Sequence, residues 1–329
     1  MKTVVLGDGG WGTALAVMLN ELNHSVYLWS NFPDYAKVLN ESRENIKFLP
    51  NVKIPAGIEI GSDINKAIEG AELVVLAIPS QYMRGICRNL NRVRARCLLS
   101  VAKGIEKGSL QRMSQVIGEE VSGVPVVVLS GPSHAEEVVR KLPTAVVSAS
   151  RDINLAVYIQ KIFMSDRFRV YTTTDVIGAE MGSALKNVIA IAVGICDGLG
   201  LGDNAKVALM TRGLAEIARL GEAMGARRET FGGLAGIGDI VVTCISRYGR
   251  NLRFGHLLAG GKSVQDALNS TEMVVEGAFT ASAAFELGKH YNVEIPICNE
   301  VYRIIHKGKS YKQAIKDLMK RSPKKEMEW

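Results

Sequence analysis

The first twelve residues, Met-Lys-Thr-Val-Val-Leu-Gly-Asp-Gly-Gly-Trp-Gly (1–12), decide the fold of the first half of the chain. An apolar strand runs into a Gly-x-Gly-x-x-Gly turn at Gly7, Gly9 and Gly12, and a helical stretch follows at once. Gly7 permits the tight turn, Gly9 keeps bulk away from a diphosphate, and Gly12 lets helix and strand pack closely. Three glycines alone also fit an ordinary strand-turn-helix start. The flanking strand and helix favour a dinucleotide site at the N-terminus of that helix.

Beyond this turn, apolar runs alternate with amphipathic stretches. We expect strands at 3–7, 25–30, 73–78, 97–101, 126–130 and 145–149, and helices at 11–22, 63–70, 80–92, 109–118 and 134–141. Continuous Val, Leu and Ile runs separated by helices are typical of a parallel sheet that is covered on both faces. The pattern predicts a doubly wound α/β domain of the Rossmann type.

The pattern changes near residue 175. Strand-like runs nearly vanish, and helices are expected at 178–197, 204–225, 276–291, 297–307 and 311–320. We therefore predict two domains: residues 1–175 as a dinucleotide-binding Rossmann domain, and residues 176–329 as an all-helical domain for substrate and catalysis.

Composition narrows the class of protein. The 329 residues are 47% hydrophobic and 22% charged, which is ordinary for a soluble globular chain. Five scattered cysteines without a Cys-x-x-Cys spacing indicate reduced thiols and no metal site. The apolar stretch 188–196 is too short to span a bilayer, and no secretory signal is recognisable, so we expect a cytoplasmic protein without a membrane span.

The formal net charge is +7, from 40 basic and 33 acidic residues. Part of the excess lies in the tail 316–329 and in an arginine cluster at 84–96, both of which fit solvated surface. No basic motif is interleaved with aromatic residues, so we expect no nucleic-acid partner. A basic excess also suits small phosphorylated ligands.

Lys186 is the first candidate for chemistry. It lies in Ala-Leu-Lys-Asn-Val-Ile-Ala-Ile-Ala-Val (184–193), a helix that is apolar almost all round and so predicted to be buried. Burial lowers the pKa of a lysine towards neutrality, which suits an acid–base catalyst. The alternative is a lysine whose ammonium reaches water along its flexible stem.

Two loops follow neighbouring expected strands. Lys103 lies in Ser-Val-Ala-Lys-Gly (100–104), and Gly131 and Ser133 lie in Ser-Gly-Pro-Ser (130–133). Ligands of open α/β sheets bind beyond the carboxyl ends of the strands, where an exposed amide and a hydroxyl can contact an anion. Each residue alone also fits a turn.

A third cluster lies in the second half of the chain. Asp239 ends the turn Gly-Ile-Gly-Asp (236–239), and Arg250 and Asn251 lie after it, where a guanidinium fork can hold a phosphate. Glu276 is either a further ligand contact or an acid in the first turn of a helix. An exposed basic loop is the alternative for Arg250 and Asn251.

These motifs together resemble the bacterial-type NAD(P)-dependent glycerol-3-phosphate dehydrogenases. The resemblance covers nearly the whole chain and weakens only after about residue 310. It is carried by Gly-Asp-Gly-Gly-Trp-Gly-Thr-Ala (7–14), Ser-Val-Ala-Lys-Gly-Ile-Glu (100–106), Leu-Ser-Gly-Pro-Ser-His-Ala (129–135), Glu-Met-Gly-Ser-Ala-Leu-Lys-Asn-Val (180–188), Gly-Leu-Ala-Gly-Ile-Gly-Asp-Ile-Val-Val-Thr-Cys (233–244), Arg-Asn (250–251) and Val-Val-Glu-Gly (274–277).

The resemblance implies reversible oxidation of sn-glycerol 3-phosphate to dihydroxyacetone phosphate, for glycerophospholipid synthesis, by a homodimer. It implies that Lys186 exchanges the proton of the substrate hydroxyl. The implied substrate contacts are Lys103, Gly131, Ser133, Lys186, Asp239, Arg250 and Asn251. The implied cofactor contacts, beside the three glycines, are Gly10, Trp11, Phe48, Lys103, Ala135, Arg250, Val274 and Glu276.

The chain departs from the family pattern at two places. Gly249 stands where the family usually has serine, so a hydroxyl contact is missing, and the amide of Gly249 is the expected substitute. Ser-Asn-Phe (30–32) follows the second strand, where arginine favours NADP and an acid favours NAD. Asn31 can hydrogen-bond either ribose, so we expect use of both NAD and NADP.

Two other functions stay open. A related two-domain dehydrogenase of the 3-hydroxyacid or 6-phosphogluconate type would also use a lysine, but on a carboxylate substrate. A non-enzymatic dinucleotide sensor would need no base in the helix that carries Lys186.

Overall fold

The computed structural model describes residues 1–323, 325 and 326, so Lys324 and residues 327–329 of the basic tail lie outside the described part. The chain divides into two compact units. The first contains Met1–Ala102 and Met113–Val176, and the second contains Lys103–Arg112 and the chain from Ile177 onward. Each unit has a hydrophobic core of its own.

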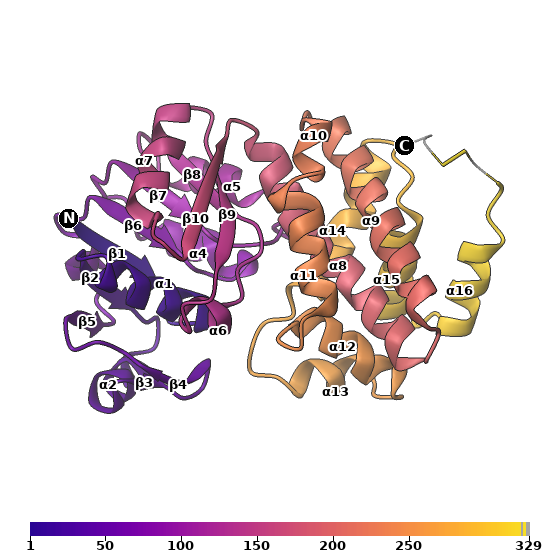
Figure 1. Ribbon diagram of the computed structural model, residues 1–329, viewed down its shortest axis with the longest axis horizontal. Helices are drawn as coiled ribbons and strands as arrows, with labels where there is room; N and C mark the ends of the chain where they lie inside the picture. Colours follow the sequence, from indigo (N-terminus) through magenta and orange to yellow (C-terminus); the bar gives the residue numbers. More distant parts are fainter. Residues whose placement is uncertain (324, 327–329) are drawn as a thin grey trace. The chain divides into compact units, whose positions relative to one another are not determined.

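The first unit is built on an eight-stranded sheet in the order β10-β9-β8-β7-β6-β1-β2-β5 (Figure 1). The strands are β1 (Lys2–Leu6), β2 (Ser25–Trp29), β5 (Ile58–Gly61), β6 (Leu73–Leu76), β7 (Cys97–Ser100), β8 (Val126–Ser130), β9 (Thr144–Ala149) and β10 (Phe168–Thr173). The central strands β6 and β7 are buried along their whole length, which explains their unbroken apolar sequence.

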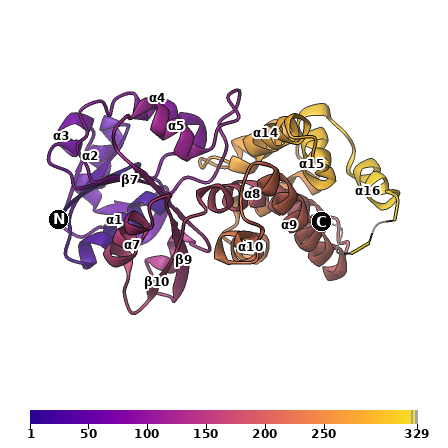
Figure 2. The same ribbon diagram turned by 90° about the horizontal axis from the view of Figure 1, so that it is seen from above.

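Helices cover both faces of this sheet (Figure 2). One face packs against α1 (Gly10–Glu21), α6 (Ala135–Val138) and α7 (Ile153–Phe163). The other packs against α3 (Ile64–Ile68), α4 (Met83–Cys87), which follows the turn Ser80–Tyr82, and α5 (Met113–Glu120). Between β2 and β5 the chain forms α2 (Pro33–Ser42) and a hairpin of β3 (Glu44–Asn45) and β4 (Leu49–Lys53). The expected Rossmann-type unit is confirmed.

The sheet differs from the expected one at its far edge. Strands β2, β1, β6, β7 and β8 are parallel, but β9 pairs with β8 antiparallel. A parallel return needs a long crossover, and the connection from Ser130 to Thr144 contains only the single turn of α6. Strands β5 and β10, the hairpin and helix α2 were not predicted, because their sequences are mixed in polarity or short. Helix α7, an apolar helix of 11 residues, was not predicted either.

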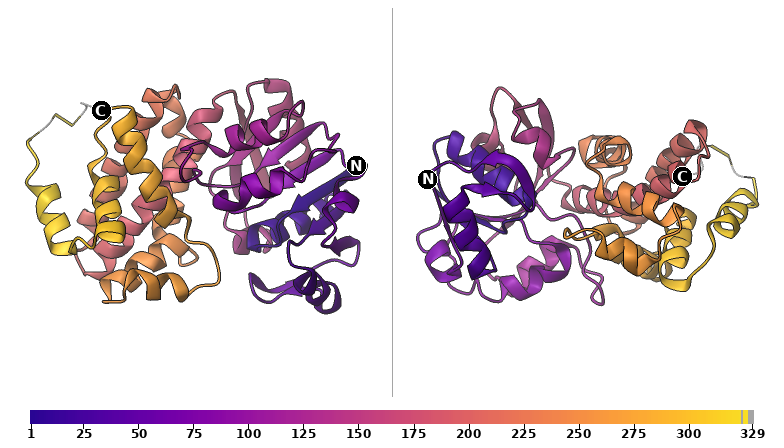
Figure 3. Two further views of the ribbon diagram at one scale, coloured as in Figure 1. Left: turned by 180° about the vertical axis from the view of Figure 1, so that it is seen from behind. Right: turned by 90° about the horizontal axis from the view of Figure 1, so that it is seen from below.

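The second unit is helical. Its helices are α8 (Val176–Gly198), α9 (Asp203–Ala223), α10 (Arg228–Phe231), α11 (Asp239–Ile245), α12 (Arg250–Ala259), α13 (Val264–Asn269), α14 (Glu276–His290), α15 (Pro296–Lys307) and α16 (Tyr311–Met319), with a π-helical turn at Leu234–Gly238. Figure 3 shows α16 at the outer edge of this unit, against α15.

Helix α8 forms the core of this unit, because its two faces are apolar and buried by the surrounding helices. This helix has 23 residues and is long and apolar enough to cross a membrane, whereas the stretch 188–196 considered alone is too short. Buried core helices pass the same test, and 94% of the apolar window of α8 is buried inside the unit.

The segment Lys103–Arg112 belongs to the helical unit although it follows β7. Ile105 is fully buried in the helical core, and Arg112 forms a buried ion pair with Glu180 of α8. The Asn187 amide of α8 also donates to the carbonyl of Lys103, at 3.3 Å. These contacts fix the loop that carries Lys103 on the helical core.

Candidate active site

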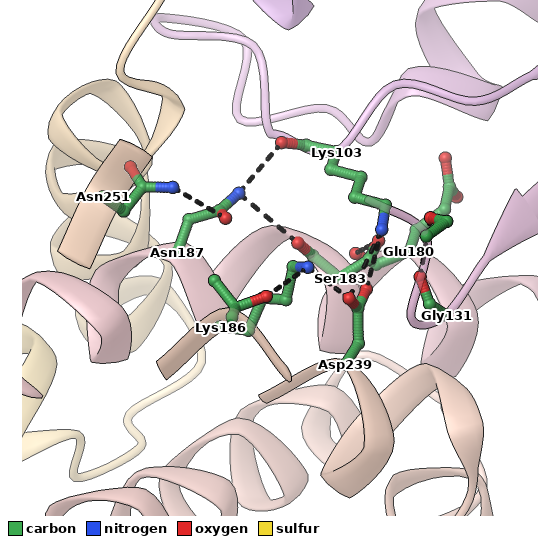
Figure 4. Close-up of polar contacts among 10 residues, drawn as sticks. Lys103, Gly131, Glu180, Ser183, Lys186, Asn187, Asp239 and Asn251 are labelled. Carbon is green, nitrogen blue, oxygen red and sulfur yellow. Dashed lines mark hydrogen bonds and ion pairs between the residues drawn. The ribbon is translucent and has the colours of Figure 1, made fainter. Parts of the chain in front are cut away.

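Lys186 points from α8 into a small polar cluster inside the helical unit (Figure 4). Its ammonium donates to Oδ1 of Asp239 and to the Thr243 hydroxyl, at 2.7 Å from the latter. Lys186 is 5% exposed and Asp239 is fully buried, so water does not screen this pair appreciably. The alternative of a lysine head reaching bulk water is wrong.

The position of Asp239 follows from the local backbone. The glycine-rich turn Leu234–Gly238 closes as a π-helical turn, and Asp239 is the first residue of α11. The positive end of a helix dipole favours a carboxylate in its first turn. Thr243 lies four residues later on the same face of α11, so both side chains meet Lys186.

Lys103 contacts the same carboxylate. Its Nζ lies 3.0 Å from Oδ2 and 3.3 Å from Oδ1 of Asp239, so two ammonium groups share one buried acid. Lys103 is partly exposed and can therefore reach a ligand while it keeps this contact.

Burial lowers the pKa of Lys186 to about 7. The Asp239 carboxylate opposes this effect, and the positive charge of Lys103 adds to it. A lysine with such a pKa can gain and lose a proton near neutral pH, which is the property an acid–base catalyst needs.

A chain of amide hydrogen bonds holds the surroundings of this cluster. The Asn251 amide donates to Oδ1 of Asn187, at 2.9 Å, and its own Oδ1 accepts from the Gly277 N–H, at 2.9 Å. Asn187 in turn donates to the Lys103 carbonyl. Asn251 is 7% exposed and both ends of its amide are engaged, so the geometry favours a positioning role beside any contact with substrate.

Arg250 lies on the surface as the first residue of α12, and its guanidinium donates to the Val274 carbonyl at 3.4 Å. Gly249 precedes it as the N-cap residue. The Gly249 amide, which is the expected substitute for the serine hydroxyl, donates to the Ser246 carbonyl at 3.0 Å. A Cβ at position 249 would lie 2.8 Å from the Thr243 carbonyl oxygen, which explains glycine in place of serine.

The glycine turn of the first unit has the geometry of a dinucleotide cradle. Gly7 has φ +114°, and a Cβ there would lie 2.5 Å from the Ala77 carbonyl oxygen. A Cβ on Gly12 would lie 1.9 Å from the Gly7 carbonyl oxygen, whereas a Cβ on Gly9 would meet nothing within 4 Å. Gly7 and Gly12 are therefore needed by the turn itself, and Gly9 leaves open space where a diphosphate would lie.

Other expected cofactor residues lie around this turn. A Cβ on Gly10 would approach the Phe48 carbonyl and the Ala135 methyl, and Trp11 packs in one small apolar cluster with Ala135. Asn31 is exposed just beyond β2, whose last residue, Trp29, accepts from the Gly7 N–H at 3.0 Å.

The remaining expected residues lie in loops and at helix starts. The Ser133 hydroxyl donates to the Gly131 carbonyl at 2.9 Å, and α6 begins after it, at Ala135. Glu276 is the first residue of α14, as its alternative as a first-turn acid predicts. Lys103, Arg250, Val274 and Glu276 belong to the helical unit, whereas the other expected cofactor residues belong to the sheet unit.

Sequence reasoning did not single out Thr243, Asn187 or the Arg112–Glu180 pair. Thr243 carried a signal, since it lies four residues after Asp239 in a stretch that folds as a helix. Asn187 lies beside Lys186 in sequence, but its partners come from distant segments. Among the described residues, no group of three or more His, Cys, Asp or Glu side chains could hold a metal ion.

The chain has an α/β unit with a glycine turn and a helical unit that buries a lysine of lowered pKa. These two features define a class of protein, the dinucleotide-dependent dehydrogenases with two domains. Two family models match the chain. The N-terminal model of NAD-dependent glycerol-3-phosphate dehydrogenase matches residues 2–156, and the C-terminal model matches residues 175–316. The chain belongs to this family.

Relatives and solved structures agree with this assignment. The chain is 49% identical to glycerol-3-phosphate dehydrogenase (NAD(P)+) of Geobacillus thermodenitrificans, over 98% of this chain and 96% of that one. It is 47% identical to the enzyme of the same name from Prosthecochloris aestuarii, over 99% and 100%. The crystal structure of glycerol-3-phosphate dehydrogenase from Coxiella burnetii is similar, with a TM-score of 0.94, 36% identity, and coverage of 97% and 99%.

Proposed function

We propose that this chain catalyses the reversible oxidation of sn-glycerol 3-phosphate to dihydroxyacetone phosphate, with NAD or NADP as hydride carrier. The observation that carries the proposal is the buried pair of Lys186 and Asp239, with the partly exposed Lys103 on the same carboxylate. The names of its relatives, which describe NAD(P)+-dependent enzymes acting on glycerol 3-phosphate, supply the substrate.

The nicotinamide cofactor supplies the hydride chemistry when it is bound. The residues that would hold it in the sheet unit are Gly7, Gly9, Gly10, Trp11, Gly12, Asn31, Phe48 and Ala135. The open space at Gly9 and the start of α1 fit a diphosphate, because unpaired backbone amides at a helix N-terminus bind anions. Lys103, Arg250, Val274 and Glu276 would contribute from the helical unit.

Lys186 would hold and move the proton of the substrate hydroxyl. In the direction of ketone reduction the Lys186 ammonium donates a proton to the oxygen on C2, and in alcohol oxidation the neutral amine accepts it. A pKa of about 7 makes both forms accessible at neutral pH. Asp239 and Thr243 would hold the Lys186 Nζ in place through their hydrogen bonds.

The substrate phosphate would be bound near the start of α12. Arg250 presents a guanidinium there, whose planar fork of donors matches phosphate oxygens. Lys103, Gly131, Ser133, Asp239 and Asn251 are the further proposed contacts. Gly249 would contribute close packing rather than its amide, since that N–H is engaged by Ser246.

The test is loss of NADH or NADPH absorbance when dihydroxyacetone phosphate is added. Lys186→Met is expected to lower kcat by about 10²-fold or more, the usual scale for an acid–base group. Lys289→Met, at an exposed lysine of α14, is the matched control and is expected to keep full activity. Near-normal turnover in Lys186→Met would refute the role of Lys186.

The same assay separates the alternatives. A dehydrogenase of the 3-hydroxyacid or 6-phosphogluconate type would turn over carboxylate substrates in place of dihydroxyacetone phosphate. A sensor would bind NADH but turn over no substrate.

We propose further that the protein is a cytoplasmic homodimer without a membrane span, and that it supplies glycerophospholipid synthesis. The burial of α8 within its unit supports the absence of a span, and the five buried, unpaired cysteines support a reducing compartment. Sedimentation equilibrium of the purified chain tests the dimer, and a single species of monomer mass would refute it.

A further inference from the structure

The glycine turn contains a buried acid that the proposed function does not use. Asp8 lies between Gly7 and Gly9 and is 8% exposed, and its Oδ2 has no hydrogen-bond partner among the described residues. A buried carboxylate oxygen without a donor is rare in a folded protein, because its desolvation is not compensated.

The backbone at Asp8 is held firmly. The Asn45 amide donates to the Asp8 carbonyl at 2.6 Å and to the Thr13 hydroxyl at 2.7 Å. Asn45 is itself fully buried, and its Oδ1 accepts from the Tyr35 hydroxyl at 2.7 Å. The backbone position of Asp8 is therefore fixed by buried hydrogen bonds rather than by solvent.

Asp8 lies beside the end of β2. The N–H of its neighbour Gly7 donates to the carbonyl of Trp29, the last residue of β2, at 3.0 Å, and Ser30 just after this strand is fully buried. In dinucleotide-binding folds this end of the second strand receives the adenosine ribose, usually through an acid located there. This chain has Ser30 and Asn31 at that place, and the adjacent glycine turn contributes the acid Asp8.

The positive charge of Lys47 compensates the negative charge of Asp8 only in part. Lys47 is the positive group that acts on Asp8, but Lys47 is exposed and its ammonium lies 5.3 Å from the ring centre of Phe48. Water and salt screen an exposed charge more than a buried one. Burial is also the main cause that raises the pKa of Asp8, as expected for a carboxyl whose donors are incomplete.

We propose that Asp8 is the residue that recognises the adenosine ribose and biases this enzyme towards NAD(H) over NADP(H). The partner-less oxygen would accept a hydrogen bond from an unmodified 2′-hydroxyl, and the same carboxylate would repel a 2′-phosphate. The inference rests on the proposed use of a dinucleotide. Asn31 alone favours neither NAD nor NADP, whereas Asp8 favours NAD.

The test measures binding without catalysis. Calorimetric titration with ADP-ribose and with its 2′-phosphorylated form gives the ratio of their dissociation constants for the whole chain. The wild type is expected to prefer ADP-ribose by about tenfold, the scale of one incompletely screened charge contact. Asp8→Asn keeps the size of the side chain and removes its charge, so the ratio is expected to fall to about threefold or less, chiefly through tighter binding of the 2′-phosphorylated form.

Asp34→Asn is the matched control, because Asp34 is an exposed acid in the first turn of α2, on the chain that follows β2. It is expected to leave the ratio unchanged. Asp8→Ser is a second variant, whose small hydroxyl replaces the carboxyl if Asp8→Asn does not fold.

A wild type without preference, or a ratio that Asp8→Asn and Asp8→Ser leave unchanged, would overturn the proposal. Equal weakening of both nucleotides by both variants would also overturn it, since that result assigns Asp8 to the fold alone. Turnover of dihydroxyacetone phosphate is measured separately, so a failed proposal for Asp8 and a failed proposal of function give different results.

Discussion

Replacing Asp239 by asparagine is expected to shift the pH dependence of catalysis to lower pH. The carboxylate of Asp239 stabilises the ammonium form of Lys186, and the amide of asparagine keeps the size of the side chain without the charge. Ketone reduction needs the Lys186 ammonium, so its rate is high below the pKa of Lys186 and falls as the pH rises through it. In the wild type that pKa is about 7, and in Asp239→Asn the fall is expected at lower pH.

The size of the shift follows from the contact. Two unit charges about 4 Å apart attract each other by about 4 kcal/mol at an effective dielectric constant of about 20. One pKa unit corresponds to about 1.4 kcal/mol, so the upper bound is a shift of about three units. Relaxation of the site and entry of water reduce this value, and we expect a shift of at least about one unit.

The measurement is the pH profile of kcat/KM for dihydroxyacetone phosphate reduction, which reports groups of the free enzyme. Lys103→Gln is the companion variant, because the charge of Lys103 lowers the pKa of Lys186 and its loss is expected to shift the profile upward. Opposite shifts of the two variants separate an electrostatic effect from general damage to the site. Unchanged profiles, or shifts in the same direction, would refute the reasoning.

Three further predictions concern other parts of the chain. Gly9→Ala is expected to fold normally, since its Cβ meets nothing within 4 Å, and to weaken NADH binding in calorimetry by about tenfold or more. Gly12→Ala is the contrasting variant, expected to lower the unfolding free energy in urea, because its Cβ would lie 1.9 Å from a carbonyl oxygen. Gly249→Ser, which introduces the usual family residue, is expected to raise KM for dihydroxyacetone phosphate, since its Cβ would lie 2.8 Å from the Thr243 carbonyl; an improved KM would contradict this packing argument. Glu216→Ala is expected to lower the unfolding free energy by about 2–4 kcal/mol with kcat preserved, because two N–H groups at the start of α15 lose their acceptor. Burial raises the pKa of Glu216 from 4.5 to about 7, so the folded state binds this proton more tightly than the unfolded state. The stability that the carboxyl contributes to the wild type is therefore greatest at low pH and falls as the pH rises from 4.5 to about 7. The unfolding free energy of Glu216→Ala is expected to lack this dependence on pH.

The sequence allowed prediction of those parts of the fold whose signal is local. The strands β1, β2, β6, β7 and β8 are short apolar runs between helices, and they appear within one or two residues of their expected positions. Strand β10 is a short stretch that begins with alternating buried and exposed residues and has Arg169 as its second residue, so it resembles a loop sequence. The antiparallel direction of β9 depends on how far one helical turn can carry the chain, and no single residue signals it.

The site divides in the same way. Lys186 was recognisable because a charge interrupts an otherwise apolar helix, and Asp239 because it ends a glycine turn. That Lys103 and Lys186 share one carboxylate depends on contacts between residues far apart in sequence. The engagement of the Gly249 amide depends on the turn that begins at Ser246, which the missing serine hydroxyl does not reveal.

The membership of Lys103–Arg112 in the helical unit has a consequence for how the protein can be divided. The polypeptide passes from one unit to the other three times, after Ala102, after Arg112 and after Val176. A fragment that starts at Ile177 would lack Ile105 from its core and would leave Glu180 buried without Arg112. Either half expressed alone would therefore have an incomplete hydrophobic core. During synthesis on the ribosome, residues 103–112 emerge before α8, so they cannot pack against the helical core until α8 has been made.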